Sequence, residues 1–403
     1  MKNKMFEEQK FVLLQNNYTV SYTENNCFVN GKEESNEQNN NMKPIEIAEA
    51  LKLNFYKSFL KQHFKNVVIL TAAGTSIDNG DNNGKSRDGL WDYCKVEIEM
   101  LKKYFKDSEY LEQIMNYCAT KDIESLLSYL IIYEKIHKVI EYENKYIKKE
   151  IEKKIAEACK LTLSLLSPHT VFLRKMLARK NNDSRIQLFT TNYDTLFEQA
   201  ASKAGFIIID GFSFTHPREF SGKWFDLDIV NRDKTRLKQE ESFLPEVFHL
   251  YKLHGSLNWL RTSDNKIIQN DNPSVPLIIY PANEKYESSY EQPYFEMMSR
   301  FQQALRKENS LLIIIGFGFQ DKHLNNVIFE AIEQNPSFQL LIINYNNTKG
   351  IDTNYLLPFF YDKDNKIVKH GVNIVFDTFQ NFTNNIPENL SYSSKSGVIN
   401  DSI

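Results

Sequence analysis

Short apolar runs rich in β-branched residues recur along the chain, and most end in a polar or glycine-containing turn before a helical pattern. They lie at residues 67–70, 186–189, 207–209, 250–253, 277–280, 311–315, 340–343 and 374–376. Strands that are apolar on both faces are typical of a parallel sheet covered by helices on both sides. After residue 318 the partner pattern follows, because Leu324, Val327, Ile328 and Ala331 fall on one helical face. The sequence therefore predicts an α/β fold with a doubly wound, Rossmann-like parallel sheet.

Residues 95–180 interrupt this alternation. They contain no convincing strand, and Ile123, Leu126, Leu127 and Leu130 form an apolar stripe at helical spacing. A helical block of this length is too large for a simple crossover, so we expect an inserted helical subdomain. The Rossmann-like domain would then comprise residues 44–94 and 181–385. Residues 1–43 are polar and asparagine-rich, so we expect partial disorder there, with a hairpin turn at Asn30-Gly31. Residues 386–403 are expected to be a flexible tail.

Bulk composition excludes several classes of protein. The formal net charge is −3 over 403 residues, which leaves no electrostatic footprint for direct binding of nucleic acid. The chain has no run of about 18 apolar residues, so no membrane span is predicted. It also has no apolar signal core near the N-terminus, so we expect a cytoplasmic protein. Cys27, Cys94, Cys118 and Cys159 lie far apart without a Cys-x-x-Cys pair, so neither a zinc site nor a disulfide framework is expected.

Polar and small residues gather after two of the predicted strands, where doubly wound sheets bind ligands. Ala72-Ala73-Gly74-Thr75-Ser76 follows the first strand, and small side chains there let backbone N–H groups and hydroxyls approach a pyrophosphate. Tight helix–sheet packing alone would explain such residues equally well. Residues 190–194 follow the second strand. Asp194 or Thr195 could be a helix N-cap, but a cap does not explain Asn192.

Two further segments follow strands later in the chain. His254 precedes Gly255-Ser256 at a strand end, where a neutral imidazole could accept a proton from a hydroxyl, although a lone histidine is usually structural. Gly316 and Gly318 follow the most hydrophobic strand. No third glycine stands at the distance of the dinucleotide fingerprint, which argues against a hydride-transfer enzyme.

Taken together and in this order, the four segments resemble the sirtuin family over roughly residues 60 to 380. Residues 72–76 look like its Gly-Ala-Gly-x-Ser loop, and residues 190–194 look like its Thr-Gln-Asn-x-Asp motif. Residues 253–257 are similar to its Leu-His-Gly-Ser segment. Residues 316–318, with the later strand that ends at Asn344, resemble its ribose- and adenine-side loops.

Three departures from the family pattern indicate which branch of the sirtuin family the chain resembles. Ala72 replaces the first glycine of the loop, and residues 84–91 stand where a Pro-Asp-Phe-Arg element is expected. The two Cys-x-x-Cys pairs that hold zinc in protein-deacylating sirtuins are missing. With the helical insertion, this combination resembles the bacterial anti-phage defence branch, whose members degrade NAD⁺. The layout is similar to that of the sirtuin-like subunit that works with a HerA-type ATPase.

The resemblance implies NAD⁺ as substrate, no metal, and cleavage of the nicotinamide–ribose bond. It assigns catalysis to Asn192, His254 and Asp194. It assigns dinucleotide binding to Ala72, Ala73, Gly74, Thr75, Ser76, Thr190, Gly316, Gly318 and Asn344. Because a free NAD⁺ hydrolase endangers its own cell, we expect activity gated by a homo-oligomer or by a partner such as a HerA-type ATPase. A protein deacylase, a non-catalytic module that senses NAD⁺ or ADP-ribose, and a structural subunit of a nucleic-acid-processing complex remain as alternatives.

Overall fold

The computed structural model describes residues 9–34, 42–106, 108–137, 142–179, 183–231, 243–273, 275–278, 292–345, 354–362 and 367–387. Its strands are β1 (Lys10–Leu14), β2 (Thr19–Tyr22), β3 (Cys27–Val29), β4 (Lys32–Glu33), β5 (Asn66–Thr71), β6 (Gln187–Thr190), β7 (Ile207–Ile209), β8 (Val247–Lys252), β9 (Gly255–Ser256), β10 (Trp259–Arg261), β11 (Ile267–Gln269), β12 (Leu277–Ile278), β13 (Ser310–Ile315), β14 (Gln339–Asn344), β15 (Phe360–Asp362), β16 (Ile367–Val368) and β17 (Val372–Phe376). Its helices are α2 (Pro44–Phe59), α3 (Ala73–Ile77), α4 (Arg87–Tyr93), α5 (Lys95–Tyr104), α6 (Leu111–Thr120), α7 (Ile123–His137), α8 (Tyr142–Cys159), α9 (His169–Leu177), α10 (Leu196–Ala204), η2 (Gly222–Asp226), α12 (Tyr294–Leu305), α13 (Lys322–Gln334), η4 (Asn354–Phe359) and α14 (Phe379–Asn385).

An eleven-stranded sheet organises the molecule, in the order β4-β3-β2-β1-β17-β14-β13-β5-β6-β8-β7. The seven strands from β17 to β7 are mutually parallel, and the four N-terminal strands pair antiparallel. The prediction of a Rossmann-like, doubly wound sheet is confirmed, in a sheet that is mixed at one end.

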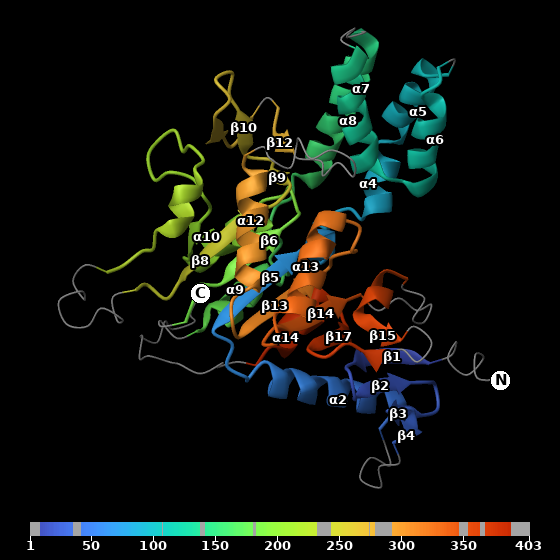
Figure 1. Ribbon diagram of the computed structural model, residues 1–403, viewed down its shortest axis with the longest axis vertical. Helices are drawn as coiled ribbons and strands as arrows, with labels where there is room; N and C mark the ends of the chain where they lie inside the picture. The colour runs from blue at the N-terminus through green and yellow to red at the C-terminus, as the bar shows by residue number, and fades with distance from the viewer. Residues whose placement is uncertain are drawn as a thin grey trace.

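Alternation along the central strands sends side chains to two helical layers. Val68 and Leu70 of β5 lie in one hydrophobic cluster, which includes residues of α12 and α13. Val67 and Ile69 lie in the other, with residues of α2, α9, α10 and α14. In Figure 1, α12 and α13 lie in front of the central strands. Burial on both faces explains why these strands are apolar throughout.

Helices α4 to α8 have a third core of their own, which includes Ile98, Leu101, Leu126 and Ile151. They stand together at one end of the molecule, at the top of Figure 1. Tyr193, from the polar motif that follows β6, is buried in the same core. The helices between β5 and β6 therefore reach the carboxyl edge of the sheet.

The described part of the N-terminal segment extends the main sheet. β1 pairs with β17 and is continued by β2, β3 and β4. Leu13 and Leu14 are buried, and apolar burial offsets the entropy of ordering this polar segment. The predicted hairpin at Asn30-Gly31 is confirmed, since it joins β3 to β4. Residues 1–8, 35–41 and 388–403 lie outside the described residues.

The prediction for the run at 277–280 was wrong. The run was expected in the parallel sheet, but its described part is the two-residue strand β12, which pairs antiparallel with β9. A short apolar run does not reveal its pairing partner, and here the partner is the segment that follows His254.

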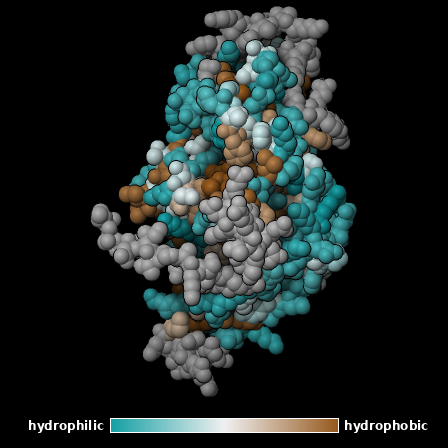
Figure 2. Space-filling model, turned by 90° about the vertical axis from the view of Figure 1, so that its left-hand side faces the viewer, coloured by the Kyte–Doolittle hydropathy of each residue, from teal (hydrophilic) through white to brown (hydrophobic). Residues whose placement is uncertain are grey.

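Most of the side chains visible in Figure 2 are hydrophilic, and the apolar ones gather in small areas near mid-height. Among the described residues, no helix is long and apolar enough to cross a membrane.

Candidate active site

The motifs of the sequence meet at the carboxyl edge of the sheet, where the chain reverses its order of strands. β5 lies between β13 and β6, and β6, β8 and β7 continue on one side while β13, β14 and β17 continue on the other. This is the topological switch point at which open α/β sheets bind ligands. Residues 72–76 follow β5, and residues 316–318 follow the adjacent β13.

The loops that follow β5 and β13 are in direct backbone contact. The Gly74 amide donates to the Gly316 carbonyl at 3.1 Å. A Cβ on Gly316 would lie 2.5 Å from Gly74 Cα, and one on Gly74 would overlap Gly316 Cα in turn. Gly316 also has a φ of +65°, which other residues adopt with strain. Both glycines are therefore required by backbone packing, whereas Gly318 is exposed and has no such close neighbour.

Asn192 connects the loop that follows β6 to the loop that follows β5. Its Nδ2 atom lies 3.0 Å from the Ala72 carbonyl, 3.2 Å from Thr75 Oγ1 and 2.8 Å from Ser76 Oγ. Its backbone amide donates to Thr190 Oγ1 at 3.1 Å. The partly buried Asn192 is thus held against the small-residue loop, and a helix cap would not require this arrangement.

Asp194 forms a second connection between the same loops. Its Oδ2 accepts from Ser76 Oγ at 2.5 Å, and its Oδ1 accepts from the Leu196 amide at 3.0 Å. Asp194 is buried, with 6% of its surface exposed. One carboxylate oxygen therefore supports the start of α10, as the capping alternative expects, and the other orients Ser76.

Lys252 supports this loop from β8. Its buried ammonium donates to the Tyr193 carbonyl at 3.3 Å, to the Asp194 carbonyl and to Glu198 Oε1 at 3.1 Å. Burial raises the pKa of Glu198, although the positive charge of Lys252 opposes that effect. The sequence analysis did not single out Lys252, because a lone lysine inside an apolar strand carries no motif.

His254 follows β8 and is buried, with 5% of its side chain exposed. Its Nε2 lies 3.1 Å from Asp321 Oδ2. Burial lowers the pKa of His254, but the hydrogen bond to Asp321 and the negative charges of Glu124 and Asp321 outweigh it and raise the pKa above its usual value. Asp321 keeps a lowered pKa despite its own burial, because His254 and the α13 amides stabilise the carboxylate. The imidazole is therefore paired with an ionised carboxylate.

The helices between β5 and β6 also contribute a group to this region. Glu124, in the first turn of α7, accepts from the Tyr193 hydroxyl at 3.0 Å. Tyr193 lies between Asn192 and Asp194 in the chain. Leu257, three residues after His254, packs against the same helical core. Both motifs that carry the candidate catalytic residues therefore touch these helices.

Asn344 lies at the end of β14, beside β13, and its carbonyl accepts from the Asp377 amide at 2.7 Å. Ala73 is exposed at the start of α3, directly after β5. The structure thus places all the candidate residues on one edge of the sheet. It connects Ala72, Thr75, Ser76, Thr190, Asn192 and Asp194 through hydrogen bonds. Within the part of the chain that the structure describes, no hydrogen bond joins His254 to this set, and its partner is Asp321.

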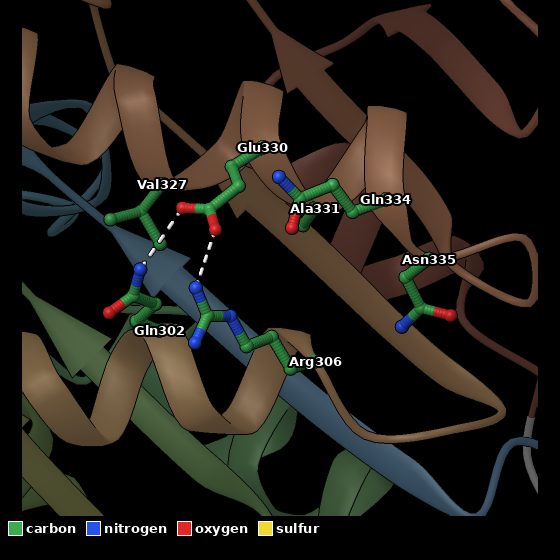
Figure 3. A pocket seen from close by; sticks show the side chains of 7 residues that line it. All are labelled: Gln302, Arg306, Val327, Glu330, Ala331, Gln334 and Asn335. Atoms are coloured by element: carbon green, nitrogen blue, oxygen red, sulfur yellow. Dashed lines mark hydrogen bonds and ion pairs between the residues drawn. The ribbon is translucent and has the colours of Figure 1, made fainter.

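A cavity of about 160 Å³ lies elsewhere, in the groove between α12 and α13 (Figure 3). Arg306 and Gln302 both bond to Glu330 across it, and none of the candidate residues lines it. Among the described residues, no group of three or more His, Cys, Asp or Glu side chains could hold a metal ion.

Comparison with known proteins supports the resemblance in part of the chain. Residues 187–357 match the family described as a SIR2-like domain. A Sir2 homologue mutant in complex with ADP-ribose is similar over 82% of this chain and 94% of its own, at 14% identity and a TM-score of 0.41. Sir2Tm bound to a propionylated peptide is similar over 82% and 96%, at 12% identity and a TM-score of 0.35. Among curated proteins, none matches it.

Proposed function

We propose that this chain, which contains a SIR2-like domain in residues 187–357, is an NAD⁺ hydrolase that cleaves the nicotinamide–ribose bond. The family match supports an NAD⁺-dependent activity in general. The observation that carries the proposal is the network in which Asn192 and Asp194 hold the loop that follows β5 at the switch point. A buried histidine with a carboxylate partner stands at the end of β8. Hydrolysis at a sugar carbon is helped by a positioned general base, the role proposed for His254, and by a group that orients the sugar and the water, the role proposed for Asn192.

In this proposal the dinucleotide lies over residues 72–76, with Thr190, Gly316, Gly318 and Asn344 as further contacts. Asn192 orients the ribose and the attacking water, while Asp194 fixes the loop that positions the sugar. His254 takes a proton from the water as its oxygen bonds to C1′ of the ribose. The bond between C1′ and the nicotinamide nitrogen breaks, and nicotinamide leaves with the electron pair. Loss of the base should slow turnover by about 10²- to 10⁴-fold.

The test is quantification of nicotinamide released from NAD⁺ by the purified chain, with and without its co-expressed genomic neighbour, and with His254→Ala and Asn192→Ala as variants. We expect the parent chain to release nicotinamide in at least one of the two conditions and both variants to release none, although each variant unfolds at the same temperature as the parent chain. An acyl-lysine peptide is supplied in a parallel reaction. Lysine deacylation would instead assign a deacylase, and NAD⁺ binding without nicotinamide release in either condition would assign a sensing module.

We also propose that the activity serves anti-phage defence in the bacterial cytoplasm by depleting NAD⁺, and that it is gated. The contact of Tyr193 with Glu124 supports gating, because it links the catalytic loop to helices that the chemistry itself does not need. A homo-oligomer or a HerA-type ATPase would act through these helices. A monomeric chain that is fully active without any addition would contradict the gate.

A further inference from the structure

Asp321 lies where the turn that follows β13 enters α13, and its two carboxylate oxygens face different groups. Oδ1 accepts from the backbone amides of His323 at 2.8 Å and Leu324 at 3.1 Å, which makes Asp321 the N-cap of α13. Oδ2 lies 3.1 Å from Nε2 of His254, which comes from the far side of β5 and β6 in the sheet. Both side chains are at most 6% exposed.

We propose that Asp321 is the positioning residue of His254: it fixes the plane of the imidazole and keeps the proton on Nε2, so that Nδ1 has the lone pair. This inference rests on the proposed function, because it gives His254 the role of base. An ionised carboxylate can only accept a hydrogen bond, and therefore Nε2 must be the protonated nitrogen. The same carboxylate stabilises the imidazolium that forms when Nδ1 takes a proton.

Helix capping alone does not account for this residue. Ser86 caps α4 and Thr378 caps α14 with a single hydroxyl oxygen each. Serine, threonine and asparagine serve as N-caps about as well as aspartate does. Only an acidic residue provides a second, charged acceptor that can hold a buried imidazole while the first oxygen caps the helix.

The cap also explains why Asp321 is itself well positioned. Its side chain is anchored by two amides of a thirteen-residue helix, so little conformational freedom remains for the oxygen that faces His254. The charged groups that act on His254 are Asp321 at the start of α13 and Glu124 in α7. Both raise the pKa of the imidazole, and only Asp321 touches it.

Two substitutions in the full chain separate the charge of Asp321, its contact with His254 and its role as a helix N-cap. Asp321→Asn keeps the cap and removes the charge, while Asp321→Ser keeps the cap and removes the contact. The pKa and tautomer of His254 are followed by NMR in histidine-labelled protein without NAD⁺, with its signal assigned as the one missing from His254→Gln. We expect the pKa of His254 to fall in both variants. Ser86→Ala removes a different N-cap and is expected to leave the titration unchanged.

Nicotinamide release supplies the second readout. We expect kcat to fall by about 10²- to 10⁴-fold in Asp321→Asn, with a much smaller change in KM, because the residue acts through the base. An unchanged pKa and tautomer of His254 in both variants would overturn the proposal, as would a kcat equal to that of the parent chain. If the parent chain releases no nicotinamide with or without its genomic neighbour but the titration shifts as expected, the proposed hydrolase fails while the positioning contact stands.

Discussion

At the scale of single residues, the candidate site consists of side chains that hold one another. Asn192 and Asp194 both bond to Ser76, and His254 bonds to Asp321. Position at a strand end drew attention to Ser76, Asn192, Asp194 and His254 in the sequence, and the resemblance to sirtuins assigned their roles. Asp321 was missed, because an aspartate before an amphipathic helix is fully explained as an N-cap until its second oxygen is located in space.

The pH dependence of nicotinamide release follows from the pairing of His254. A base acts in its neutral form, and the carboxylates of Asp321 and Glu124 raise the pKa of His254 above its usual value of about 6.5. We therefore expect kcat/KM to fall as the pH drops through this raised pKa, about tenfold per pH unit below it. A kcat/KM profile from pH 5 to 9 measures this. An acid limb below pH 6, or none at all, would contradict the assigned base.

The contact between Gly74 and Gly316 gives a second prediction. Gly316→Ala places a methyl group 2.5 Å from Gly74 Cα and also strains a φ of +65°, so we expect a loss of about 3 kcal/mol in the free energy of unfolding. Gly205→Ala is the matched control. Its φ is +75° but no atom lies within 4 Å of the added carbon, so only about 1 kcal/mol should be lost. Equal losses in urea denaturation would show that the loop contact is unimportant.

At the scale of elements, β8 supports the loop that follows β6 through Lys252. Lys252→Met removes the ammonium from the carbonyls of Tyr193 and Asp194 and leaves Glu198 without its cation. We expect a loss of about 3 kcal/mol in the free energy of unfolding, because breaking a buried ion pair strands the other charge. The double variant Lys252→Met/Glu198→Gln should recover part of that loss. If chemical denaturation shows that the double variant is no more stable than Lys252→Met, the contacts of Lys252 with the backbone carbonyls, and not the ion pair, account for the lost stability.

Elements with long, continuous apolar runs were predictable, and elements that depend on pairing were not. β5 and β13 are buried along their whole length, and their sequences show it. β1 is short, and nothing in its five residues reveals that its partner is β17, more than 350 residues later. β12 was expected in the parallel sheet for the same reason, because a short apolar run fixes no partner. Sequence patterns report burial, whereas strand pairing depends on the whole chain.

At the scale of the whole molecule, three cores meet around the candidate site. Two cover the faces of the sheet, and the third lies within α4 to α8. Tyr193 joins the loop that follows β6 to the third core through both its ring and its hydroxyl. The composition of residues 95–180 predicted helices, but their contact with the motif that follows β6 could not be foreseen, because Tyr193 reads in sequence as an unremarkable spacer between Asn192 and Asp194.

The proposed gate predicts a specific effect of removing that hydroxyl. Tyr193→Phe keeps the buried ring but loses the hydrogen bond to Glu124, which should lower the free energy of unfolding by only about 1 kcal/mol. Tyr129→Phe removes a hydroxyl elsewhere on α7 and serves as the control. We expect Tyr193→Phe alone to reduce the difference between nicotinamide release by the isolated chain and by the chain co-expressed with its genomic neighbour. A partner can change the activity only through contacts that differ between the inactive and the active state of the chain. If the helices control the loop through the contact of Tyr193 with Glu124, weakening that contact must make the isolated and the co-expressed chain more alike in activity. The same difference in both variants and in the parent chain would show that the helices do not control the site through Tyr193.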